Sequence, residues 1–252
     1  MKKLDSKIEY FATLKNSLEQ LFQNLMLIVP SLIAGAISFV LLLFIGGIVL
    51  ISTLIGNKIY LVLLIPFILV AVLVSIFFQV ALFGMVSKVS IGLKATLSEG
   101  FAYAKKLFLK YLGATILLAF GALVIFGIGV LLIYLLTFIP HWIKYLLIFL
   151  MVLILIVIFF LYLFHWFFLE PVLIYKNQDI IKSTFKIFCL NKKESINAAL
   201  VLILTSVALT IFFMILSFIP IISSLVSIAI SLFFTPWIML YKFNIYNQLK
   251  NK

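Results

Sequence analysis

Long runs of apolar residues alternate with short polar segments along the whole chain. A helix needs about 20 apolar residues to cross the hydrocarbon core of a membrane. Six segments reach this length, and they are Leu25–Ile55, Ile59–Val86, Leu112–Phe138, Trp142–Leu169, Ile196–Phe218 and Ile221–Met239. Only an uncharged turn near Pro220 separates the last two, but one helix over both would be far too long for a single span. The pattern therefore predicts an all-α integral membrane protein with six transmembrane helices.

The segments before the first, third and fifth spans show apolar side chains at helical spacing. In Thr96–Tyr111 these side chains are Leu97, Phe101, Ala104, Phe108 and Tyr111. In the N-terminal segment they are Leu4, Ile8, Phe11, Leu18 and Leu25, and in the third segment they are Ile181, Phe185 and Phe188. Thr96 and Glu99 have capping-box spacing, and Asp179 is a candidate N-cap. We expect three amphipathic helices on the inner membrane surface, with their lysines toward the lipid headgroups.

The lysines set the expected orientation. The chain has 19 positively charged side chains, all of them lysines, and all but Lys58 and Lys144 fall on one side of the six spans. Cytoplasmic loops carry an excess of Lys and Arg. We therefore expect a multi-pass protein of the cell membrane with both termini in the cytoplasm.

Each amphipathic segment precedes a pair of spans, so the chain divides into three similar units at about residues 4–88, 96–176 and 179–250. The second unit contains Phe167-Phe168-Leu169-Glu170-Pro171, and the third contains Phe233-Phe234-Thr235-Pro236. The first unit has Phe77-Phe78-Gln79 and lacks the proline. We predict one transmembrane domain, residues 1–252, built from a threefold repeat. Chance similarity between apolar segments is the alternative.

The composition excludes two broad classes of protein. Hydrophobic residues make up 66% of the chain and charged residues 10%, whereas soluble domains have about 45–50% and 25%. A soluble globule needs more polar surface than this, and a disordered chain needs lower hydrophobicity. The net charge of +12 does not indicate nucleic acid, because the lysines are spread between apolar runs and arginine is absent.

One stretch carries a family resemblance. Glu170-Pro171-x-x-Ile174-Tyr175, followed by the basic segment Asp179–Lys193, resembles an element of poorly characterised prokaryotic six-span membrane proteins. These include proteins similar to the membrane domain attached to some glycerophosphodiester phosphodiesterases. The resemblance covers about residues 75–250 and implies the six-span architecture. It does not extend to the soluble catalytic domain, so it implies none of that chemistry.

Ionisable side chains inside a membrane are costly and often functional. Two candidates, His165 and Glu170, lie near the cytoplasmic end of the fourth predicted span. One interpretation is a belt of interfacial side chains beside Pro171, which we expect to bend or end its helix, as we do for Pro66 and Pro236. The other is a buried Glu170 that binds a cation or a proton.

Hydroxyl side chains form stripes in the last two predicted spans. The stripe in the sixth span consists of Ser224, Ser227, Ser231 and Thr235, and that in the fifth of Ser206, Thr210 and Ser217. Such stripes either line a polar path or mark tight helix packing. Packing is the more frequent reason.

The sequence contains no catalytic motif, so we expect neither an enzyme nor a cofactor or metal site. The first hypothesis is a membrane accessory, scaffold or lipid-organising module. Five lysines of its amphipathic helices would contact anionic headgroups of the inner leaflet. These lysines are Lys105, Lys106, Lys110, Lys182 and Lys186. This hypothesis allows for a protein partner or for a homo-oligomer. The alternative is a small transporter or channel that uses the Ser/Thr stripes and Glu170.

Overall fold

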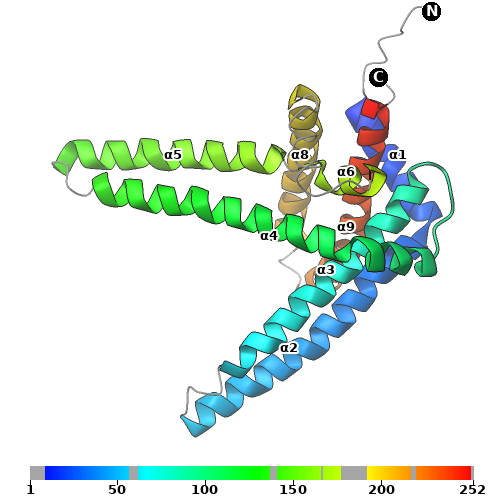
Figure 1. Ribbon diagram of the computed structural model, residues 1–252, viewed down its shortest axis with the longest axis horizontal. Helices are drawn as coiled ribbons and strands as arrows, with labels where there is room; N and C mark the ends of the chain where they lie inside the picture. The colour runs from blue at the N-terminus through cyan, green and yellow to red at the C-terminus, as the bar shows by residue number, and fades with distance from the viewer. Residues whose placement is uncertain are drawn as a thin grey trace, which may run out of the picture. The chain divides into compact units, whose positions relative to one another are not determined.

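A computed structural model describes residues 9–56, 62–136, 141–165, 167–176, 192–216 and 220–250 of the 252-residue chain. Every regular element in these residues is helical, and none of them is a strand (Figure 1). The all-α class expected from the apolar pattern is confirmed for these parts of the chain. The third predicted amphipathic segment, with Ile181, Phe185 and Phe188, lies outside the described residues, except for its last two lysines.

The chain forms two compact units. Unit 1 combines Met1–Phe108 with Leu200–Lys252, and unit 2 is Leu109–Ala199. Two helices, α4 (Leu97–Leu136) and α8 (Lys192–Leu216), contribute to both units. The single domain and the three repeats expected from the sequence remain predictions.

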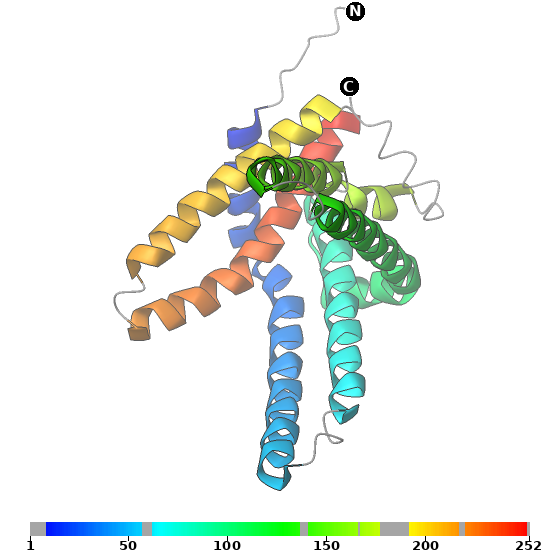
Figure 2. The same cartoon turned by 90° about the vertical axis from the view of Figure 1, so that its left-hand side faces the viewer.

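Unit 1 contains a helical hairpin and the helices that pack at one end of it. After α1 (Tyr10–Gln23), a short 3₁₀ turn (η1, Leu25–Ile28) leads into α2 (Val29–Ile55). α2 runs side by side with α3 (Leu64–Val89), as both views show (Figure 1, Figure 2). The last helix, α9 (Pro220–Lys250), packs against α1 and α3. These contacts bring the first and the last described helices together within the unit.

Three segments are long and apolar enough to cross a membrane: Leu25–Ile55, Leu64–Val89 and Leu97–Leu136. Two shorter apolar stretches, Tyr145–Phe159 and Ile196–Phe212, lie in α5 (His141–His165) and α8. Large apolar side chains such as Leu54 and Leu123 are exposed on these helices, as expected for surfaces that face lipid chains. These features indicate a membrane protein, and the full set of six spans remains a prediction.

Helix α4 corrects one expectation. We expected a surface helix over Thr96–Tyr111 and a separate span from Leu112, but one helix runs from Leu97 to Leu136. The sequence has no proline at the expected boundary, so the helical hydrogen bonds continue where the polarity changes. The predicted capping box is confirmed. The Thr96 backbone N–H donates to Glu99 Oε2 at 3.2 Å, and the Glu99 N–H donates to Thr96 Oγ1 at 3.4 Å.

The apolar face of the first turns of α4 packs against α3, although we expected it to lie on lipid. Ala104 is buried, and the Phe101 and Phe108 rings lie 6.1 and 6.0 Å from the Phe77 ring. Gly84 makes this close approach of the two helices possible, because a Cβ there would lie 2.5 Å from the Tyr103 Cβ. Helix α3, and not the membrane surface, thus covers this apolar face of α4.

Helix α9 continues through Pro236 to Lys250, so Pro236 does not end it, and a bend at this proline remains a prediction. Proline inside a helix costs about 3 kcal/mol. The turns after Pro236 bury several large side chains, and these include Leu240, Tyr241, Phe243 and Ile245. Burial of one such side chain contributes about 1.5–3 kcal/mol, so together these side chains outweigh the cost of the internal proline. Pro66 and Pro171 lie in the first turns of α3 and α6 (Leu169–Lys176), where proline removes no helical hydrogen bond.

Unit 2 is built on a second hairpin, formed by α4 and α5 (Figure 1). The Tyr162 hydroxyl on α5 donates a 2.7 Å hydrogen bond to the Leu118 carbonyl of α4. The fourth span, predicted as Trp142–Leu169, corresponds to α5, which ends at His165. Leu169 instead begins α6.

Candidate functional site

Polar side chains form a network between α1 and α9 in unit 1. Asn244 on α9 donates two hydrogen bonds of 2.9 Å, to Ser17 Oγ and Gln20 Oε1 on α1. One turn further, the Gln248 amide donates to Thr13 Oγ1 at 3.0 Å. Thr13 and Ser17 are buried, whereas the donors Asn244 and Gln248 are half-buried and exposed, so the network is shielded from solvent on its α1 side. It fixes α1 against the C-terminal turns of α9.

Sequence reasoning missed this network. Two members of the predicted apolar stripe, Phe11 in α1 and Leu25 in η1, are exposed, while the buried face of α1 carries Thr13 and Ser17 together with Leu14 and Leu21. A third member, Leu18, is half-buried, and the remaining two, Leu4 and Ile8, lie outside the described residues. The available signal was the spacing of polar residues on one face of each segment, at Thr13, Ser17 and Gln20 and at Asn244 and Gln248.

The connection between α3 and α4 lies at the same end of unit 1. Lys88 and Glu99 form an ion pair across it, and the Asn247 amide of α9 donates a 3.3 Å hydrogen bond to Ser90 Oγ. The hydrogen bond from Lys88 and that from the Thr96 backbone hold the pKa of the Glu99 carboxyl below its usual value. The first turns of α1 and α4, the C-terminal turns of α9 and this connection therefore form one polar end of unit 1.

Exposed lysines and exposed apolar side chains lie side by side at this polar end. The connection presents Ile91, Leu93 and Lys94, and all three are exposed. Lys105 and Lys106 are exposed on the next helical turns, and Lys110 is half-buried. The other two predicted headgroup contacts, Lys182 and Lys186, lie outside the described residues.

A mixed polar and apolar cavity lies between α2, α3 and α9 in unit 1. Its volume is about 330 Å³, and its lining consists of Ser31, Ala34, Gly35, Ser75, Phe78, Gln79, Leu82, Leu232 and Thr235. Thr235 belongs to the predicted hydroxyl stripe. The side chains of the other stripe members, Ser224, Ser227 and Ser231, are not among those described. Ser75 and Gln79 were not predicted.

The polar groups of this cavity differ from the other hydroxyls of the long helices. Thr53, Thr205 and Thr210 each donate a 2.8 Å hydrogen bond to the carbonyl one turn earlier in their own helix. Ser31, Ser75, Gln79 and Thr235 make no such side-chain hydrogen bond within the described part of the chain. Polar groups inside a membrane protein are costly when they lack a partner. The cavity therefore presents donors and acceptors to whatever occupies it.

The two ionisable candidates lie in unit 2. Glu170 is 8% exposed in the first turn of α6, where the helix dipole favours a carboxylate. It interacts electrostatically with the Tyr111 hydroxyl group. His165 is the last residue of α5, and its side chain is not described. Glu170 therefore has a buried setting at the start of α6.

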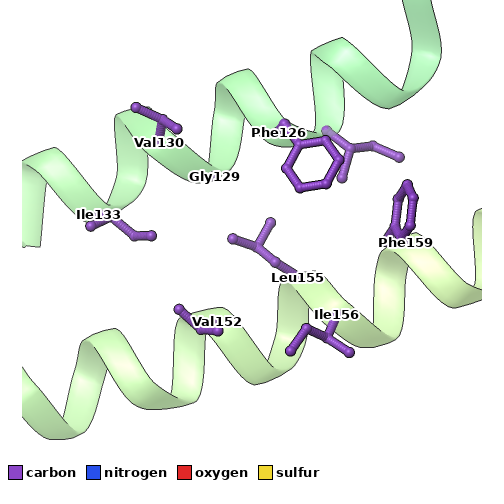
Figure 3. Close-up of a pocket in the computed structure, with 9 residues that line it drawn as sticks. Phe126, Gly129, Val130, Ile133, Val152, Leu155, Ile156 and Phe159 are labelled. Carbon is purple, nitrogen blue, oxygen red and sulfur yellow. The ribbon is translucent and has the colours of Figure 1, made fainter. Parts of the chain in front are cut away.

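A second cavity, of about 300 Å³, lies between α4 and α5 in unit 2. All of the described side chains that line it are apolar, and Figure 3 shows Phe126, Ile133 and Phe159 directed into the space between the two helices. Such a lining offers no hydrogen bond that could orient a ligand. It can accommodate hydrocarbon but has no groups for chemistry.

Within the described residues, no group of three or more His, Cys, Asp or Glu side chains is placed to hold a metal ion. Comparison with known proteins adds nothing to the assignment, because no family model, curated protein or solved structure matches this chain. The resemblance to the membrane domain of some glycerophosphodiester phosphodiesterases therefore remains a prediction.

Proposed function

We propose that this chain is a non-enzymatic, multi-pass protein of the cell membrane that organises lipids at the inner leaflet. The observation that supports this role best is the polar end of unit 1, where Lys94, Lys105 and Lys106 are exposed beside the exposed Ile91 and Leu93. Apolar side chains at such a position enter the headgroup boundary, and lysines next to them attract anionic lipids.

The same end supports the orientation that the lysines predict. Lys15 on α1 and Lys242 on α9 lie on the segments that gather there, together with Lys88 and Lys94. An excess of lysine marks the cytoplasmic side of a membrane protein. We infer that the polar end of unit 1 lies in the cytoplasm, that six helices cross the membrane, and that both termini are cytoplasmic.

Two contacts in unit 1 support the threefold repeat. The C-terminal half of α3 packs on the first turns of α4, and the C-terminal turns of α9 pack on α1. In both cases the second helix of a pair meets an amphipathic segment. A repeat would place the end of the second pair, near Glu170, on the third amphipathic segment at residues 179–193 in the same way.

A transport function is less well supported than the lipid-organising role. Thr205, Ser206 and Thr210 on α8 each donate to a carbonyl of their own helix, so these hydroxyls need no further partner. Glu170 belongs to unit 2, whereas the fifth and sixth predicted spans lie largely in unit 1. A channel or transporter stays the alternative, and a protein partner or homo-oligomer is compatible with either role.

The lysines provide the test. The variant Lys94→Gln/Lys105→Gln/Lys106→Gln is expected to retain at least fivefold less phosphatidylglycerol, relative to phosphatidylethanolamine, than the wild-type protein. Each lysine near a membrane surface contributes about 1 kcal/mol of attraction to anionic lipids. The measurement is quantitation of the lipids that remain bound after mild detergent extraction from nanodiscs of equal composition.

The matched control is the Lys→Arg variant at the same three positions, which keeps the charge and should keep the bound phosphatidylglycerol. Raising the salt concentration should weaken retention by the wild type, because exposed charges are screened. Equal retention by the Gln variant and the wild type would refute a role for these lysines in gathering anionic lipid.

A further inference from the structure

We propose that the cavity between α2, α3 and α9 binds one molecule of an uncharged hydroxylated lipid of the diacylglycerol class. Its polar lining is Ser31, Ser75, Gln79 and Thr235. The inference names a ligand for the lipid-organising role, and it relies on the proposed function only for the cytoplasmic location of this end of the hairpin. The size, polarity and depth of the cavity support this ligand.

The volume fits a ligand better than isolated waters. About 330 Å³ lies at the lower end of the range of small-molecule sites, about 300–1,000 Å³. Water alone would require on the order of ten molecules, at about 30 Å³ each, against a wall that is mostly apolar. The apolar part of the wall is formed by Ala34, Phe78, Leu82 and Leu232. A molecule with a polar group and a hydrocarbon part matches both walls.

The polar wall selects an uncharged headgroup. Among the described residues it consists of three hydroxyl groups and one carboxamide, and none of the described side chains that line the cavity is charged. Hydroxyls and amides both donate and accept hydrogen bonds, as lipid hydroxyl and ester groups require of a binding site. A phosphate or ammonium group here would be removed from water without a counter-charge, which is strongly unfavourable.

The depth of the cavity matches the glycerol level of a lipid in the inner leaflet. α2 begins at Val29, at the polar end of unit 1, and Ser31 lies in its first turn. Gly35 lies six residues beyond Val29, about 9 Å along the axis at 1.5 Å per residue. A hydrocarbon core of about 30 Å begins near this level. The hydroxyl and ester groups of a lipid would thus meet the polar wall, with the acyl chains toward the membrane centre.

Gly35 supplies a variant that blocks the cavity without disturbing the surrounding packing. A Cβ on Gly35 would have no atom within 4 Å, so a leucine there can extend into the cavity. Gly46 is the matched control. It lies on α2 eleven residues further along, on nearly the same face, it also has open space around a Cβ, and it does not line the cavity.

The experiment is native mass spectrometry of the full-length protein with dioleoylglycerol, dioleoylphosphatidylglycerol or free glycerol at matched concentrations. We expect one dioleoylglycerol per wild-type chain and at least tenfold weaker binding in Gly35→Leu and Gln79→Leu, with Gly46→Leu unchanged. Thermal unfolding of each variant without lipid checks that the fold is kept. Both glycine variants gain helix propensity.

Three results would overturn the proposal. Dioleoylglycerol bound equally by the wild type and by Gly35→Leu would place the lipid elsewhere. Phosphatidylglycerol bound with equal affinity and lost in Gly35→Leu would show that the cavity accepts a charged headgroup. Free glycerol bound as tightly as dioleoylglycerol would identify a soluble polyol site. The outcome is independent of Lys94, Lys105 and Lys106, so this proposal and the proposed function can fail separately.

Discussion

The variant Asn244→Leu is expected to lower the free energy of unfolding by about 2 kcal/mol or more. The Asn244 amide is a donor to both Ser17 Oγ and Gln20 Oε1, and leucine removes both hydrogen bonds at once. A buried polar group that loses its partner costs about 1–3 kcal/mol. Ser17 is fully buried, and its own hydroxyl donates to the Thr13 carbonyl at 2.7 Å, so water cannot easily replace the lost donor. The measurement is denaturant-induced unfolding of the purified protein in micelles.

The control for Asn244 is Gln23→Leu, at an exposed position near the end of α1. It should leave the free energy of unfolding within about 0.5 kcal/mol of the wild type. In a double-mutant cycle, Asn244→Leu and Ser17→Ala should be non-additive, because both remove the same contact. Full stability of Asn244→Leu, or additive effects in the cycle, would mean that the α1–α9 network does not hold these helices together.

The variant Gly84→Leu is expected to have a second large effect, because it forces α3 and α4 apart. A Cβ at Gly84 would lie 2.5 Å from Cβ and 2.7 Å from Cγ of Tyr103, and atoms this close to the backbone cannot move aside alone. Overpacking a well-packed contact costs about 1–3 kcal/mol. The ion pair between Lys88 and Glu99 crosses the same junction and should be disrupted as well. Thermal unfolding in micelles measures the loss.

Gly100→Leu, on the facing helix, should act like Gly84→Leu, because a Cβ there would lie 2.9 Å from Met85 and 3.0 Å from the Ala81 carbonyl oxygen. Gly46→Leu controls for the change from glycine to leucine in a membrane helix, since its surroundings are open. Stability of Gly84→Leu equal to that of Gly46→Leu would contradict the close packing of α3 on α4.

The apolar pattern predicts the helices well where a polar segment of the sequence coincides with the end of a helix. The first apolar segment in the structure, Leu25–Ile55, has the predicted bounds. The second, Leu64–Val89, differs from the predicted Ile59–Val86 by only a few residues at each end. The pattern fails at Tyr111, where we placed a helix boundary on a change of polarity alone. Polarity decides which medium a segment meets, but the backbone continues as a helix until a residue or a packing contact stops it.

The polar contacts between α1 and α9 were not predicted, for a different reason. In an amphipathic segment, each polar side chain can be assigned to water or to headgroups, so the spacing of Thr13, Ser17 and Asn244 does not show that they are partners. Only the packing of two segments more than 200 residues apart gives them partners. A contact of this kind depends on the fold and not on local spacing.

The cavity was partly predictable. Thr235 belongs to a stripe that the sequence shows, and Gln79 is the only carboxamide within the second predicted span. An isolated amide in an apolar helix is itself a signal, because it needs a partner inside the membrane. The sequence does not show that Ser31 on α2, Gln79 on α3 and Thr235 on α9 line the same cavity, because this depends on how three helices pack.

The most direct test of the account is the side of the membrane on which the polar end of unit 1 lies. In a Cys189→Ser background, which removes the only cysteine of the chain, single cysteines are introduced by Asn57→Cys and by Lys94→Cys. In the sequence, Asn57 follows the end of α2 at Ile55, whereas Lys94 follows the other end of the hairpin, at Val89 of α3. The account predicts that a membrane-impermeant maleimide labels intact cells only at position 57 and labels position 94 only after lysis. Labelling of position 94 from outside intact cells would contradict the cytoplasmic location of the lysines and, with it, the proposed role at the inner leaflet.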